Sequence, residues 1–175
     1  MARAIFSNSA EPCERATVNY FAARPSVELA QEQDTDGAQM KAIVKTKAES
    51  GIDILDLEEP VAGENDILVE VVAGSLCGCG LHVFEWTADY EWLPMPLVLG
   101  HEFAGRVVEI GDKITEVSVG DRITAMPAFP CGECEFCLVG KGDACRKRYA
   151  LGLTSDGAFS DFLRIRGSRH LQNSG

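Results

Sequence analysis

Four cysteines lie close together in the C-terminal half of the chain, with the spacing Cys131-x2-Cys134-x2-Cys137-x7-Cys145. The residues between them are small, polar or turn-forming, so a short loop can fold back with all four sulfurs pointing inward. Four thiolates held this close can complete one closed, tetrahedral zinc shell. The alternative is a pair of disulfides, which would have to bridge neighbouring cysteines inside a very tight loop. The spacing favours a structural zinc lobe, which we expect over residues 126–150.

The composition sets limits on the partners of this chain. Its 175 residues, 46% of them hydrophobic, can bury a core without disulfides. The formal net charge is -11, the wrong sign for binding a nucleic-acid backbone or an anionic membrane. No apolar run is long enough to span a bilayer, and the N-terminus lacks the apolar core of a secretion signal. We therefore expect a cytoplasmic protein without nucleic-acid or membrane partners.

The chain divides into three parts. Residues 1–39 are charged or polar and show neither strand alternation nor a helical face, which is typical of a flexible extension. The acidic residues of this extension argue against an organelle-targeting segment. Strand-like stretches recur from Met40 onward, which predicts a domain over residues 40–166. Residues 167–175 are polar and indicate a disordered or artificial tail.

Short strands dominate the predicted domain. Aliphatic and β-branched stretches bounded by Gly and Asp turns are found at residues 40–44, 67–73, 103–110, 123–125 and 158–165. Only residues 81–86 are clearly helical in pattern. This pattern predicts a mainly β fold, a partly open β-barrel with short helices.

A second group of metal-binding residue types occurs earlier in the chain. Residues 77–82 read Cys-Gly-Cys-Gly-Leu-His, and residues 100–102 read Gly-His-Glu. Sulfur, imidazole and carboxylate together suit a catalytic zinc, because such a set leaves one coordination position open. Taken separately, Cys77 is also typical of a small buried hydrophobe, and His101 beside Glu102 of a surface pair.

Five motifs follow one another between residues 40 and 166. They are Cys77-Gly78 with His82, the Gly100-His101-Glu102 triplet, the Gly120-Asp121-Arg122 turn, the four-cysteine segment and Asp156-Gly157-Ala158-Phe159. In this order and spacing the chain resembles the GroES-like catalytic domain of the zinc-dependent medium-chain dehydrogenases, which include alcohol, sorbitol and threonine dehydrogenases. Met40-Lys41-Ala42 and the His-Val-Phe-Glu-Trp run at 82–86 are more similar to the L-threonine 3-dehydrogenase branch.

The resemblance implies two Zn²⁺ sites and a nicotinamide cofactor, NAD(P). It implies that Cys77, His101 and Glu102 hold the catalytic zinc. Cys131, Cys134, Cys137 and Cys145 match the structural set. In the family, the zinc polarises a substrate alcohol and a hydride then passes to the nicotinamide. His82 matches a position that in some members relays the alcohol proton outward.

The chain departs from the family pattern in two respects. Cys79 stands where the family has a Ser or Thr hydroxyl that passes the substrate proton along, and Gly80 stands where an Asp is usual. Cys79 takes the position of that catalytic hydroxyl and is therefore a candidate catalytic residue. Because a thiol forms only weak hydrogen bonds, Cys79 is also a candidate for an extra zinc ligand. No strand followed by Gly-x-Gly-x-x-Gly is found, so we expect no Rossmann domain in this chain.

Two functions remain open at this stage. The first is the zinc-binding catalytic domain of an NAD(P)-dependent alcohol, polyol or threonine-type dehydrogenase, an oxidoreductase with a small-molecule alcohol substrate; the chain would then be truncated and inactive alone. The second is a non-catalytic, zinc-stabilised GroES-like interaction module. Self-association into homo-oligomers through exposed apolar surface is a further expectation.

Overall fold

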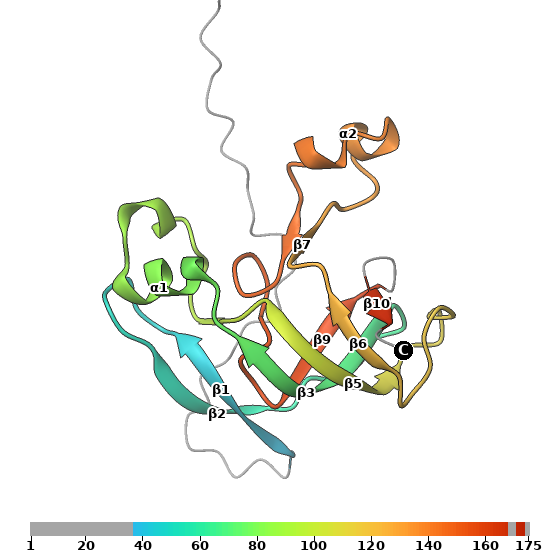
Figure 1. The fold of residues 1–175 in the computed structure, drawn as a ribbon, viewed down its shortest axis with the longest axis horizontal. Helices are drawn as coiled ribbons and strands as arrows, with labels where there is room; N and C mark the ends of the chain where they lie inside the picture. The colour runs from blue at the N-terminus through green and yellow to red at the C-terminus, as the bar shows by residue number, and fades with distance from the viewer. Residues whose placement is uncertain (1–36, 168–170, 174–175) are drawn as a thin grey trace, which may run out of the picture.

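The fold consists mostly of strands, with a few short helices (Figure 1). The computed structural model describes residues 37–167 and 171–173. The strands are β1 (Gln39–Lys45), β2 (Asp53–Glu58), β3 (Asp66–Ser75), β4 (Leu97–Val98), β5 (Glu102–Ile110), β6 (Arg122–Ala125), β7 (Ala128–Phe129), β8 (Tyr149–Ala150), β9 (Phe162–Arg166) and β10 (Leu171–Asn173). The α-helices are α1 (Gly78–Glu85) and α2 (Glu135–Leu138), and the 3-10 helices are η1 (Ala88–Tyr90) and η2 (Gly142–Ala144).

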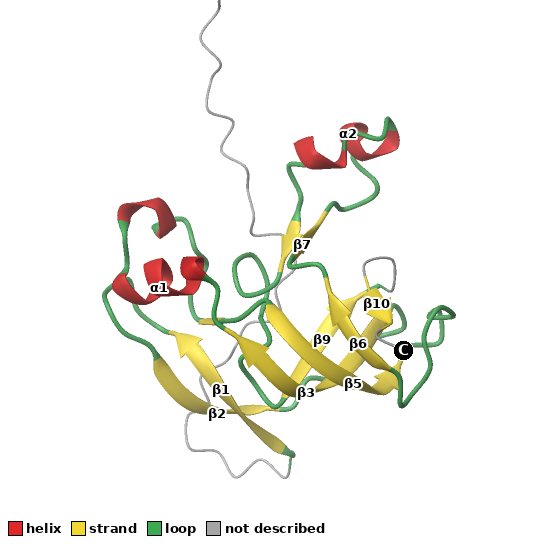
Figure 2. Ribbon diagram, viewed as in Figure 1, coloured by secondary structure: helices red, strands yellow, loops and turns green. Residues whose placement is uncertain are grey.

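The strands form three antiparallel sheets (Figure 2). The largest has five strands in the order β10-β6-β5-β3-β9, the second has the order β2-β1-β4, and β7 pairs with β8. Their hydrogen-bonded ladders do not close into one continuous barrel within the described residues. The mainly β fold expected from the sequence is confirmed, and no parallel strand-helix-strand unit occurs in the described part of the chain.

Alternating side chains of the central strands build the main core. Ile67 and Val69 of β3, Val107 of β5, and Leu163 and Ile165 of β9 are almost completely buried. Each such side chain contributes about 1.5–3 kcal/mol relative to an exposed one. A separate cluster forms where Met40, Ala42 and Val44 of β1 pack against β2 and β4. The inward alternation therefore explains why β1, β3, β5 and β9 were predictable.

A third apolar cluster supports helix α1. Val83 points from the helix onto Leu93, Leu97 and Leu99, which are all buried. Leu97 begins β4, the short strand that leads directly to His101. This cluster therefore fixes α1 against the segment that carries the imidazole.

Several expected boundaries differ from those in the structure. Residues 1–36 lie outside the described residues, and β1 begins at Gln39. The strand expected over 158–165 begins only at Phe162, because residues 156–159 instead bond to the chain beside Gly100. Within the segment expected to be a disordered or artificial tail, residues 167–175, the structure describes β10 at residues 171–173, which pairs with β6. Backbone hydrogen bonds to β6 hold this last strand in place. Such bonds do not require an alternation of apolar residues, so the sequence does not indicate the strand.

Among the residues that the structure describes, no helix has both the length and the apolar character needed to cross a membrane. The longest of the described helices, α1, has 8 residues.

Candidate metal centres

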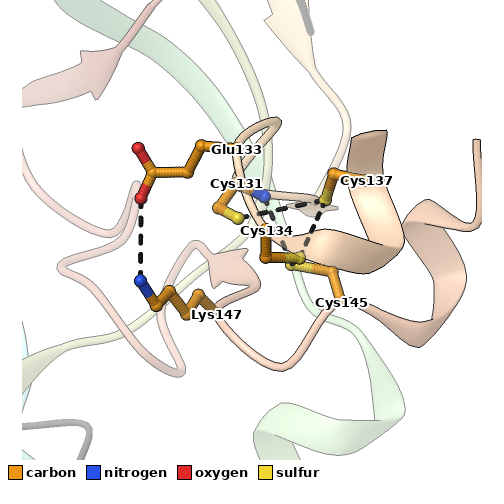
Figure 3. A network of polar contacts seen from close by, with 6 residues as sticks. All are labelled: Cys131, Glu133, Cys134, Cys137, Cys145 and Lys147. Carbon is orange, nitrogen blue, oxygen red and sulfur yellow. Dashed lines mark hydrogen bonds and ion pairs between the residues drawn. The ribbon is translucent and has the colours of Figure 1, made fainter. Parts of the chain in front are cut away.

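The four cysteines predicted as a zinc lobe meet in one cluster (Figure 3). Their sulfurs are separated by 3.4 Å for Cys134 and Cys137, 3.8 Å for Cys134 and Cys145, and 3.9 Å for Cys131 and Cys137. Four sulfurs bound at about 2.3 Å around one tetrahedral zinc would lie about 3.8 Å apart. The six cysteines in the described ranges are free thiols. The cluster therefore has the donors and the size of a structural zinc site, and disulfides do not form it.

Short turns bring the sulfurs of the lobe together. Cys134 is the N-cap of the single-turn helix α2, and the amide of Lys141 donates to the Phe136 carbonyl at 2.8 Å to fold the chain back. The backbone amide of Cys137 lowers the pKa of the Cys134 thiol to about 6, whereas burial raises the pKa of Cys137 to about 12. Cys134 therefore presents a thiolate to an incoming metal more readily than Cys137 does.

The lobe projects from the larger sheets on the β7 and β8 pair (Figure 1). At its base, the rings of Phe129 and Tyr149 stack with centroids 4.9 Å apart, and Phe129 belongs to the main core. Farther out, an ion pair joins Lys147 to Glu133 at 3.8 Å (Figure 3). Aromatic packing thus anchors the base of the lobe, while its outer part depends on the cysteine cluster.

The second metal-ligand group contains Cys77, Cys79 and His101. Their ligand atoms all lie within 4.8 Å of one another, and each residue is partly buried. The Sγ of Cys79 is 3.5 Å from Nε2 of His101. Two thiols and an imidazole suit zinc, which accepts sulfur and nitrogen ligands in tetrahedral sites.

Helix α1 positions the two thiols of this group. Cys77 has an extended backbone and is the N-cap of the helix, and its carbonyl accepts a hydrogen bond of 2.9 Å from the amide of Gly80. Cys79 lies in the first helical turn. The helix ends at Trp86, whose left-handed backbone (φ 58) lets its amide bond to the last carbonyls. Both thiols therefore belong to one rigid turn.

The Asp-Gly-Ala-Phe motif positions His101 from the other side. The Asp156 carboxylate accepts from the amide of Val98 at 3.1 Å, and the amide of Ala158 donates to the Gly100 carbonyl at 2.9 Å. A Cβ at Gly157 would lie 2.1 Å from the Gly100 oxygen, so only glycine permits this approach. Gly100 itself has φ +94 and lies against the Phe159 ring. The two motifs form one backbone brace directly before His101.

Glu102 and His82, also predicted as site residues, lie outside this group. Glu102 is exposed, and its carboxylate accepts a hydrogen bond from Ser75, which pairs with it across β3 and β5. His82 is exposed in the second turn of α1 and stacks on Tyr90, with centroids 6.2 Å apart and an interplanar angle of 14°. Ser75 and Tyr90 were missed from the sequence, because neither belongs to a motif and only the folded chain brings them to the site.

Burial and mutual repulsion shape the electrostatics of the site. Burial, followed by hydrogen bonding and charge repulsion from Cys77, raises the pKa of the Cys79 thiol to about 11. Burial and the charges of Cys79 and Cys77 also raise the pKa of Tyr90. The repulsion between the thiols and the rise at Tyr90 show that negative charge is disfavoured here without a cation. A bound divalent ion would reverse this preference, because metals deprotonate their thiol ligands.

Comparison with known proteins identifies the family. The alcohol dehydrogenase GroES-like domain model matches residues 63–173, which contain both cysteine groups and the brace. The chain belongs to the alcohol dehydrogenase GroES-like domain family.

Relatives and solved structures agree with this assignment. L-Threonine 3-dehydrogenase from Shewanella sp. (strain W3-18-1) is 37% identical over 130 residues, which are 72% of this chain and 37% of the relative. A protein from Sinorhizobium meliloti 1021 described as a candidate zinc-binding dehydrogenase, bound to NADP, is 32% identical, with a TM-score of 0.68 over 78% of this chain and 38% of its own. An alcohol dehydrogenase from Escherichia coli CFT073 complexed with NADH is 28% identical, with the same TM-score, over 78% of this chain and 39% of its own.

The chain spans a little over a third of the length of these relatives, 37–39%. The expected resemblance to zinc-dependent dehydrogenases is confirmed at the level of the family, and the two solved structures named above carry NADP and NADH.

Proposed function

We propose that this chain supplies the zinc-binding catalytic domain of an NAD(P)-dependent dehydrogenase that oxidises a secondary alcohol, with a threonine-type amino alcohol or a polyol as substrate. The observation that carries the proposal is the convergence of Cys77, Cys79 and His101 within 4.8 Å, on elements braced from both sides. The 37% identity to an L-threonine 3-dehydrogenase supports the amino-alcohol substrate class.

The residues of this chain would act as follows. Cys77 and His101 hold the zinc at the start of α1 and at the end of the β4 segment. A zinc ion bound there would polarise the substrate oxygen and lower the pKa of its hydroxyl group. His82, exposed and stacked on the Tyr90 ring, accepts the released proton and passes it to solvent, because an imidazole ring can both accept and donate a proton. The four-cysteine lobe is structural, because four thiolates leave no position open.

The hydride acceptor is a nicotinamide cofactor. The described residues contain no recognisable unit that binds such a cofactor. The proposal therefore predicts negligible alcohol-dependent NADH formation by the purified chain alone, and a further domain would carry the cofactor. Two exposed apolar side chains, Leu76 directly before Cys77 and Leu81 on α1, support contact with another protein surface, from such a domain or from a second copy. Free thiols in both clusters favour the reducing cytoplasm as its compartment.

Substrate binding to the metal-loaded chain tests the proposal directly. The chain is loaded with Co²⁺, whose visible spectrum reports its ligands, and is titrated with L-threonine, sorbitol and, as a non-hydroxylic control, L-alanine. We expect L-threonine or sorbitol to change the cobalt bands of the wild-type chain, and we expect no change in Cys77→Ser. If neither alcohol changes the spectrum of a chain that holds cobalt at both sites, the proposed function is wrong.

The absence of an Asp at position 80 would also suit a zinc-stabilised module without catalysis. That alternative predicts a cobalt spectrum that no alcohol perturbs, so the same titration separates the two functions.

A further inference from the structure

We propose that Cys79 is a direct zinc ligand in this protein, so that the catalytic site is a Cys77, Cys79 and His101 set from which Glu102 is excluded. The inference rests on the proposed function only in assuming that a metal binds at Cys77 and His101. It replaces the proton-transfer role expected for Cys79 and the ligand role expected for Glu102.

The distance between Cys79 and His101 fits shared coordination. A sulfur at about 2.3 Å and an imidazole nitrogen at about 2.05 Å from one tetrahedral zinc lie about 3.6 Å apart. The observed separation of Cys79 Sγ and His101 Nε2 is 3.5 Å. Cys77 completes a triangle in which all ligand atoms lie within 4.8 Å. Cys79 thus lies at the separation from His101 that shared coordination of one zinc requires.

The contacts of Glu102 argue against a role as zinc ligand. Its side chain is exposed and accepts the hydroxyl hydrogen of Ser75, its cross-strand partner. The ligand atoms that lie within 4.8 Å of one another do not include this carboxylate, so binding zinc through it would require moving the side chain toward the thiols. Cys79, on the first turn of α1, is already partly buried beside the imidazole. Binding zinc through the Cys79 thiol therefore requires less side-chain movement than binding it through the Glu102 carboxylate.

Exchanging one ligand for the other preserves the charge of the site. A Cys, His and Glu set and a Cys, Cys and His set each bring two negative charges to a divalent ion, so the complex is neutral in both cases. Both also leave a fourth position open for a substrate oxygen. The second thiolate makes the site softer, which favours Zn²⁺ over cations such as Mg²⁺ or Mn²⁺ that prefer oxygen. Every ligand then comes from residues 77–101 of this chain.

The roles of Cys79 and Glu102 are separated by a matched pair of variants, Cys79→Ser and Glu102→Gln, in the full 175-residue chain loaded with Co²⁺. The readouts are cobalt per chain, the affinity for zinc in competition with a chelator, and the intensity of the thiolate-to-cobalt charge-transfer band. A residue that only supports a ligand through a hydrogen bond changes metal affinity by about 10–100-fold, without removing a sulfur-metal bond. The charge-transfer band responds only to bonded thiolates.

We expect Cys79→Ser to lose the band intensity of one thiolate and more than 100-fold in zinc affinity at this site. We expect Glu102→Gln to retain both. Unchanged band intensity in Cys79→Ser together with metal loss in Glu102→Gln would overturn the inference and restore the carboxylate as ligand. Cys77→Ser keeps this outcome distinct from failure of the proposed function: if that variant loses no metal, no ion binds at the site, and the proposed function fails as well.

Discussion

The ammonium group of Lys45 lies 5.1 Å from the centroid of the Trp86 ring, and Lys45 is completely buried. Its Nζ donates hydrogen bonds to the carbonyl of Glu49 and, at 2.8 Å, to that of Gly51. The amide of Gly51 in turn donates to the Phe84 carbonyl of α1 at 2.8 Å. Burial lowers the pKa of Lys45. This lysine therefore ties the end of β1 and the following loop to the helix that carries Cys77 and Cys79.

Replacing this lysine tests that connection. We expect Lys45→Met to lower the free energy of unfolding by about 1–3 kcal/mol, because two charge-assisted hydrogen bonds and a cation-π contact are lost and the relief of a buried charge offsets only part of them. Chemical denaturation followed by tryptophan fluorescence measures the change. Lys41→Met on the same strand is the control and should have little effect, since Lys41 and its partner Asp56 are both exposed. Equal or greater stability of Lys45→Met would show that the contact is not stabilising.

The brace before His101 predicts a selective loss of metal. In Gly157→Ala the new methyl group would lie 2.1 Å from the Gly100 carbonyl oxygen, so the backbone must move. We expect a loss of about 1–3 kcal/mol in stability and a fall from two zinc ions per chain to one, because His101 is displaced while the lobe is untouched. The control is Gly80→Ala, where no atom lies within 4 Å of the added Cβ. If Gly157→Ala keeps two zinc ions, the brace does not position the site.

Removal of metal should unfold the lobe before the sheets. The described residues of the outer lobe are joined by the cysteine cluster, by hydrogen bonds of its turns and by an exposed ion pair, whereas the sheets have their own apolar core. Strong chelation should therefore expose Lys141, Arg146 and Lys147 to trypsin while leaving the rest of the domain resistant. Limited proteolysis with mass spectrometry measures this, and Cys134→Ser should show the same cuts without a chelator. Uniform digestion of the whole chain would contradict a separate structural lobe.

Alkaline pH should weaken the base of the lobe through Tyr149. Burial raises the pKa of this tyrosine above its usual value of about 10. Its stabilising contribution is therefore complete below pH 10 and is lost as pH rises toward the folded-state pKa, because the unfolded chain releases the proton first. The free energy of unfolding between pH 8 and 11 should fall more steeply for the wild type than for Tyr149→Phe. Parallel curves for the two proteins would mean that Tyr149 ionises equally in both states.

The sequence predicted those elements whose side chains alternate between core and solvent. β1 was visible because Met40, Ala42 and Val44 face inward. β2 was missed because it is an edge strand, on which Ile54 is 71% exposed and the inward face is weak. A lysine within a strand gives no sequence signal that its side chain is completely buried. The contact of Lys45 with Trp86 therefore could not be predicted from the sequence.

The metal ligands were predictable to different degrees. The lobe followed from spacing alone, since its four cysteines are close in sequence and must be close in space. The second set required the fold, because 22 residues separate Cys79 from His101. The pairing of Ser75 with Glu102 depends on a β3 and β5 register that is shifted by two irregularities, which no residue pattern reveals.

The measurement that tests the account most directly is the zinc content of the purified chain by elemental analysis, with Cys77→Ser prepared in parallel. Two assembled ligand sets predict two zinc ions per wild-type chain and one in the variant, because the lobe keeps its own ion. One zinc ion in both proteins would contradict the account: only the four-cysteine lobe would then bind metal, and the set at the start of α1 would not be a catalytic zinc site.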